Sequence, residues 1–131
     1  MRRRTSGVSG SEAVEFALVL PAFLIFVLGL VDCGRLLWTN GTLAHAVESA
    51  SRCAVVNTSI CGTTATVQAY AVTQAWGLGL TSSAFTVVTT TCGTRVNGTV
   101  NFTFFIPWFF GSSPVGSGNA MILNAMACYS P

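Results

Sequence analysis

Few residues of the chain could carry out chemistry, and they are widely spread. Among its 131 residues are four acidic side chains and one histidine, His45. No Ser-His-Asp order, glycine-rich phosphate loop or pair of carboxylates outside the apolar run can be assembled from them. His45, Glu48 and Arg52 share one helical face, where a solvated row with a weak ion pair is a better interpretation than a catalytic group. We therefore predict a protein that is not an enzyme and has no cofactor.

The five cysteines are the most reactive side chains, and their spacing favours disulfides over a metal site. Four lie beyond the apolar run that begins near the N-terminus: Cys53, Cys61, Cys92 and Cys128. A zinc site would need close C-x-x-C pairs and further histidines, so no metal is expected. Several cysteines in a small domain suit an oxidising compartment, where disulfides reinforce a small core.

Four cysteines allow three connectivities. We prefer Cys53 with Cys61, which closes a short loop, and Cys92 with Cys128, which would join the end of one predicted strand to the last strand. The fifth cysteine, Cys33, has no obvious mate. We interpret it as a small buried hydrophobic residue, ahead of an intermolecular disulfide.

The composition is typical of a membrane protein or a closely packed assembly protein. Hydrophobic residues make up 51% of the chain and charged residues 8%, whereas ordinary soluble domains contain roughly 25% charged residues. Three of the six basic residues are the arginines at positions 2–4. The others, Arg35, Arg52 and Arg95, form no cluster, so the chain has no basic patch for nucleic acid.

An uninterrupted apolar run predicts a membrane-spanning helix. Residues Phe16–Val31 (FALVLPAFLIFVLGLV) are all apolar, Gly or Pro, and with its flanks the stretch 14–37 reaches the roughly 20 residues that a bilayer requires. The basic leader 1–10 predicts a cytoplasmic N-terminus, and Trp38 falls where an interfacial aromatic is favourable. Cleavage as a secretory signal at residues 44–46 is disfavoured, because this site lies far beyond the apolar run.

Helical periodicity continues past the membrane span, since apolar residues recur on one face as far as Ala54. We therefore predict one helix over 11–56, on the order of 65 Å long at about 1.5 Å per residue. Pro21 should kink this helix, because proline removes one backbone hydrogen bond. A single extracytoplasmic domain over 57–131 should follow.

The domain is predicted to be α+β. Spacing predicts a second, shorter helix over Ala65–Leu78, closed by glycines. Segments rich in β-branched, aromatic or other apolar residues predict three antiparallel strands: Phe85–Cys92, Arg95–Ile106 and Ala120–Tyr129. Residues 92–94 suit a tight hairpin turn. The aromatic segment Trp108-Phe109-Phe110 admits two interpretations, a patch for a membrane interface or partner and ordinary core packing.

The segment Gly10-Ser11-Glu12-Ala13-Val14-Glu15-Phe16 is the most informative. A small residue before the apolar run and a carboxylate five positions later resemble what a prepilin peptidase substrate presents. Gly10 would let an extended backbone enter a protease, whereas an unpaired Glu15 in lipid costs roughly 2.5 to 3.5 kcal/mol at the bilayer centre and less near its edge. A plainer interpretation is an S-x-x-E capping box from Ser9 to Glu12, with Glu15 adding favourable charge to the helix N-terminus.

The longer string EAVEFALVLPAFLIFVLGLVDCGRLLW closely resembles the N-terminus of TadE-like pseudopilins, minor components of tight-adherence (Tad, or Flp) pilus systems in bacteria. The resemblance rests on A-V-E-F at 13–16, on Pro21, on G-x-x-D-x-G-R-L-L-W over 29–38, and on an A-x-x-x-A-x-R pattern ending at Arg52. The remainder of the chain is similar in outline only. Major Flp pilins are generally much shorter, so a minor pseudopilin fits the length better.

The resemblance implies that Gly10 and Ser11 flank a prepilin peptidase cleavage point, and that Glu15, followed by Phe16, is the processing or assembly carboxylate. The partner of Glu15 would be the α-amino group of Ser11 that cleavage frees. The protein would lie in the inner membrane with residues 57–131 in the periplasm, among lipid, other pilins and pseudopilins, and Tad inner-membrane assembly proteins. The alternative is an unprocessed single-pass membrane protein whose extracytoplasmic domain binds a partner.

Overall fold

The computed structural model describes residues 9–105 and 120–131. The elements of these residues are α1 (Ser9–Val56), α2 (Thr64–Gln74), the 3-10 helix η1 (Ser82–Ala84), β1 (Phe85–Thr90), β2 (Gly93–Thr103) and β3 (Ala120–Tyr129). The predicted α+β class, with a long N-terminal helix, a second short helix and three antiparallel strands, is confirmed. The aromatic segment at 108–110 and the arginines at 2–4 lie outside the described residues.

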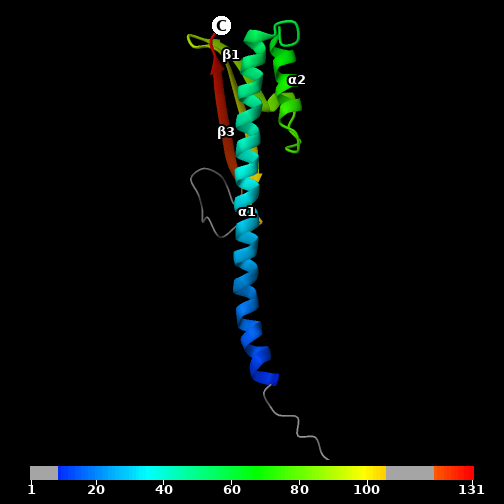
Figure 1. Cartoon of the computed structure of the whole chain (residues 1–131), viewed down its shortest axis with the longest axis vertical. Helices are drawn as coiled ribbons and strands as arrows, with labels where there is room; N and C mark the ends of the chain where they lie inside the picture. The colour runs from blue at the N-terminus through cyan, green and yellow to red at the C-terminus, as the bar shows by residue number, and fades with distance from the viewer. Residues whose placement is uncertain (1–8, 106–119) are drawn as a thin grey trace, which may run out of the picture.

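Helix α1 extends well beyond the folded domain. Its 48 residues give a length of about 72 Å at about 1.5 Å per residue, roughly twice the hydrocarbon thickness of a bilayer. Figure 1 shows α2 and the sheet beside the C-terminal half of α1, while the N-terminal half stands alone. One helix therefore carries both a packed half and a bare half.

The core forms where the C-terminal half of α1 lies on the sheet. Four residues at helical spacing are fully buried: Leu43, Ala46, Val47 and Ala50. They pack with buried residues of the sheet, including Phe85 and Val96, and with Val67 and Ala71 of α2. The strands pair in the order β1-β2-β3, both pairs antiparallel. Alternation along β2 directs one set of side chains toward α1 and the other toward solvent.

Gly98 lies on β2 at a point where side chains of α1 pack closely against the sheet. A Cβ atom at this position would lie 2.9 Å from side-chain atoms of Leu43, Val47 and Phe85. Non-bonded carbon atoms prefer about 3.5 to 4.0 Å. The missing side chain is therefore what allows α1 to approach β2.

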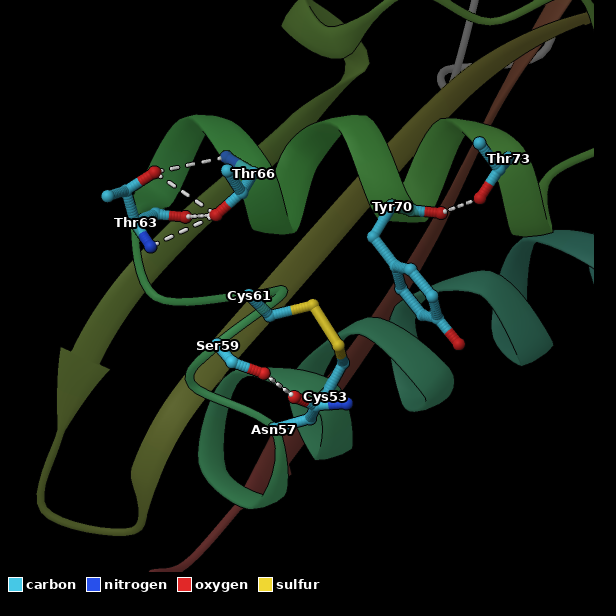
Figure 2. The surroundings of a disulfide bond; sticks show 8 residues. All are labelled: Cys53, Asn57, Ser59, Cys61, Thr63, Thr66, Tyr70 and Thr73. Atoms are coloured by element: carbon cyan, nitrogen blue, oxygen red, sulfur yellow. Dashed lines mark hydrogen bonds between the residues drawn. A yellow bond between two sulfur atoms is a disulfide. The ribbon is translucent and has the colours of Figure 1, made fainter.

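Helix α2 begins with a capping box formed by two threonines. The hydroxyl of Thr63 accepts a hydrogen bond from the backbone N–H of Thr66, and the hydroxyl of Thr66 accepts one from the backbone N–H of Thr63, as Figure 2 shows. The helix ends at Gln74, earlier than the predicted Leu78. Ala75 is the C-cap residue, and Gly77, two residues further on, adopts a φ of +81°, which glycine tolerates.

The β1–β2 hairpin turns through Thr91 and Cys92, since Thr90 pairs with Gly93. The predicted turn at 92–94 therefore starts one residue too late. Gly93 has a φ of +115°, and a Cβ atom there would overlap the carbonyl oxygen of Tyr129 on β3. Both observations require glycine at the first position of β2.

Candidate functional site

The bare half of α1 exposes a long apolar surface. Residues 10–31 are all exposed except for Gly29, which is half-buried. Among the described residues, Gly10–Val56 is the one helix long and apolar enough to cross a membrane, and none of its most apolar window is buried. Such a surface is costly in water, so it requires lipid or other helices to cover it.

Gly10 and Ser11 lie in the first turn of α1 and are exposed. A Cβ atom on Gly10 would meet no atom within 4 Å, so the backbone is uncrowded. In this structure Gly10 is helical, because α1 begins at Ser9. The extended backbone that a protease would bind at Gly10 remains a prediction. Glu12 supplies the negative charge of the first turn, which the helix N-terminus favours.

Glu15 and Phe16 follow on the second turn, and both side chains are exposed. Pro21 lies inside α1, which continues beyond it without a break. The structure therefore presents the glutamate, the phenylalanine and the proline on a continuous bare helix. The roles that the resemblance implies for Glu15 and Phe16, and the kink at Pro21, remain predictions.

Asp32 marks the boundary between the bare and the packed halves of α1. It is the first buried residue along the helix, with 4% of its surface exposed. One carboxylate oxygen accepts a hydrogen bond from Nη1 of Arg35 at 3.0 Å, and the other accepts one from the backbone N–H of Phe105 at 2.9 Å. Both oxygens are thus satisfied, one within the helix and one by the chain just beyond β2.

Arg35 completes this clamp between α1 and the end of β2. Its guanidinium carbon lies 4.3 Å from the ring centre of Phe105 and 5.1 Å from that of Phe102. These distances suit cation–π contacts. Nη1 also lies 3.5 Å from the carbonyl oxygen of Thr103, at the limit of a hydrogen bond. A carboxylate, a cation and two aromatic rings therefore join the helix to the strand.

Sequence reasoning missed this clamp. From the sequence, Asp32 and Arg35 entered as members of the G-x-x-D-x-G-R-L-L-W string, and neither was given a partner in the domain. Their spacing of three residues does predict an ion pair on a helix. The contact to Phe105, however, spans 73 positions of the chain, and a backbone N–H leaves no sequence signal.

Two disulfides stabilise the domain, in the pairing preferred from the sequence: Cys53 with Cys61, and Cys92 with Cys128. The first ties the last turns of α1 to the loop before α2, with 5.7 Å between the Cα atoms. Figure 2 shows this disulfide below the start of α2. The second joins the β1–β2 turn to β3. All three strands are therefore linked covalently at one end.

Cys33 is the free cysteine of the described residues, and it is exposed. The prediction of a buried side chain is wrong for the isolated chain, because Cys33 lies next to Asp32 but on a helix face that the domain does not cover. His45, Glu48 and Arg52 are all exposed. This exposure agrees with a solvated face rather than an enclosed site.

The described residues define a class of protein: a small, disulfide-bonded α+β domain carried on one candidate membrane helix. A family model described as TadE-like protein matches residues 10–52. The match confirms the TadE-like resemblance and covers nearly all of α1, but neither α2 nor the sheet. No curated protein and no solved structure matches the chain. The TadE-like family is a family of pilus components, so the match and the bare helix fit a component of a Tad pilus.

Proposed function

We propose that this protein is a minor pseudopilin of a Tad pilus system, cut by a prepilin peptidase after Gly10 and assembled through α1. One observation carries the proposal: the TadE-like match over 10–52 coincides with a helix whose apolar half is exposed among the described residues. A pilus subunit must be held in the membrane before assembly and pack against sister helices afterwards. An exposed apolar helix meets both requirements.

The proposed topology follows from the charges and the disulfides. The arginines at 2–4 favour a cytoplasmic N-terminus, and two disulfides favour an oxidising compartment for the domain. We place the hydrocarbon part of the span between about residue 14 and Val31, and residues 32–37 in the interfacial layer. The domain, residues 57–131, would then lie in the periplasm of a bacterium, anchored in the inner membrane.

In this proposal Glu15 acts in assembly. An exposed carboxylate near the inner edge of the bilayer is unfavourable without a partner. Cleavage after Gly10 would create a positively charged α-amino group on Ser11, one helical turn away. This group, on the same or a neighbouring subunit, would neutralise Glu15. The peptidase would have to unwind the first turn of α1 to reach the bond.

Intact mass of the purified chain tests the cleavage. In cells with an active prepilin peptidase, the mature chain should begin at Ser11, and Gly10→Ala should block maturation. Gly29→Ala is the matched control, because it also lies in α1 with no atom within 4 Å of the added Cβ, and it should mature normally. An uncut native chain would contradict the proposal and favour the single-pass membrane protein that binds a partner through its domain.

Pilus assembly tests Glu15 separately from cleavage. Glu15→Val should leave membrane insertion intact and reduce pilus formation, because the charge that pairs with the new N-terminus is lost. Glu12→Gln is the control, since this carboxylate lies in the first helical turn and serves mainly the helix N-terminus. Normal pili in the Glu15→Val strain would exclude the assembly role.

A further inference from the structure

A ring of large apolar side chains remains exposed where α1 enters the domain. Four residues form this rim: Leu37, Trp38, Trp76 and Phe105, each between 56% and 72% exposed. They come from α1, from the turn after α2 and from the chain beyond β2. Exposed aromatic side chains gathered in one place indicate a surface that something covers.

The four residues lie along about two turns of α1, between Asp32 and Trp38. The rings of Trp38 and Trp76 meet edge to face, with 5.7 Å between their centres. The backbone N–H of Phe105 is held by Asp32. Figure 1 shows that the turn after α2 and the end of β2 lie at the end of the domain nearer the bare half of α1. The elements that carry the rim therefore lie at the end of the domain nearer the bare half of α1.

The spacing along α1 matches the interfacial layer of a bilayer. The exposed apolar segment ends at Val31, and Asp32 follows as the first buried residue. From there, the rise to Trp38 is about 9 Å at about 1.5 Å per residue. The headgroup layer on each side of the hydrocarbon is about 5 to 8 Å thick, so Trp38 lies at its outer edge. Tryptophan is the residue that this layer favours most, together with tyrosine.

We propose that the rim is a second membrane contact, in which Trp76, Trp38 and Phe105 rest in the headgroup layer of the leaflet that α1 leaves. The inference rests on the proposed insertion of α1. Lipid is the occupant because the rim continues the apolar surface that α1 exposes on all sides. Arg35 and Trp38 also line an open cavity of about 430 Å³ between α1, the turn after α2 and β2. Arg35 can therefore face a lipid phosphate from the same rim.

The contact would set the depth at which α1 inserts, because the domain packs on the same continuous helix. Trp76 is the informative residue, because it belongs to the domain and its ring contacts that of Trp38. If only the segment up to Val31 enters the bilayer and the domain stands off, Trp76 stays in water. If the domain rests on the bilayer, Trp76 reaches the headgroup layer.

Fluorescence quenching by brominated lipid tests the contact in the full-length chain. The chain contains three tryptophans, so Trp38→Phe with Trp108→Phe leaves Trp76 as the only one. In phosphatidylcholine vesicles, replacing part of the lipid with brominated phosphatidylcholine should lower the emission of Trp76. Iodide added to the water should quench it only weakly. Where Trp38→Phe impairs folding, judged by loss of the disulfides, Trp38→Tyr is the second variant, because tyrosine combines an aromatic ring with a polar group as tryptophan does.

Two matched variants in a background without native tryptophans separate the possible outcomes. Ile60→Trp places the probe on the exposed loop beside Cys61, at the far end of the domain, and should respond to iodide but not to brominated lipid. Leu24→Trp places it in the bare helix and should be quenched by brominated lipid. Quenching of the Leu24→Trp variant without quenching of Trp76 overturns the rim contact and leaves the insertion of α1 standing. Quenching of neither overturns both.

Discussion

At the scale of single residues, Asp32 has the contacts of a structural carboxylate, although it lies at the edge of an apolar helix. It is buried, and both of its oxygens are hydrogen-bonded. Removing such a carboxylate lowers the free energy of unfolding by more than the net contribution of its hydrogen bonds. The reason is that the N–H of Phe105 and the guanidinium of Arg35 lose their acceptor. The sequence predicts the pair with Arg35 but not the contact that joins helix to strand.

Asp32→Ala should lower the free energy of unfolding of the domain by about 1 to 3 kcal/mol, the usual cost of leaving buried donors unsatisfied. Asp32→Asn should cost less, since the amide keeps one acceptor. Thermal unfolding in detergent, followed by near-UV circular dichroism, measures both. Glu48→Ala removes an exposed carboxylate from the same helix and should change stability by less than about 0.5 kcal/mol. Equal effects of Asp32→Ala and Glu48→Ala would show that the clamp contributes nothing.

Two glycines should respond to alanine in opposite directions. Gly98→Ala inserts a methyl group 2.9 Å from three side chains in the core, and such overpacking costs about 1 to 3 kcal/mol. Gly41 is exposed inside α1 with open space around it, so Gly41→Ala should raise stability by about 1 kcal/mol through helix propensity. Urea unfolding of both variants measures whether each substitution raises or lowers the free energy of unfolding. Stabilisation by Gly98→Ala would mean that α1 can move away from β2 without loss.

At the scale of elements, sequence periodicity predicted the types correctly because helix and strand patterns are local. The ends of the helices and strands differ from the predicted ends where tertiary contacts determine them. β2 was expected to reach Ile106, but it ends at Thr103, since Asp32 takes the N–H of Phe105. The close packing of α1 on Gly98 likewise depends on residues far apart in the chain. No window of sequence contains both partners of either contact.

The two disulfides should differ in what they contribute to the domain. They join residues separated by 8 and by 36 positions, for which loop-closure entropy gives about 2.5 and about 4 kcal/mol. Removing Cys92–Cys128 with alanines should therefore destabilise the domain more than removing Cys53–Cys61 in the same way. Urea unfolding of the two double variants compares them. The reverse order would indicate that burial of Cys61, which is only 2% exposed, outweighs chain entropy.

At the scale of the whole molecule, α1 divides the protein into two regions with different solvents. Its N-terminal half has an apolar surface suited to lipid or sister helices, and its C-terminal half is the central element of the domain core. Because the helix is continuous, the domain cannot tilt or slide without moving the membrane segment. The clamp at Asp32 lies at the junction and fixes the height of the domain.

The arginines at 2–4 should decide whether the disulfides form, although they lie at the opposite end of the chain. In the proposed topology, replacing all three with glutamate removes the positive charge that would retain the N-terminus in the cytoplasm, so part of the protein should insert with its domain in a reducing compartment. Thiol labelling after denaturation measures whether the disulfides have formed. The native chain should label at Cys33 alone, whereas misoriented chains should label at all five cysteines. The control is Arg95→Glu, which changes the charge within the domain and should leave labelling at Cys33 alone. If the triple glutamate variant is also labelled at Cys33 alone, the leader does not set the orientation.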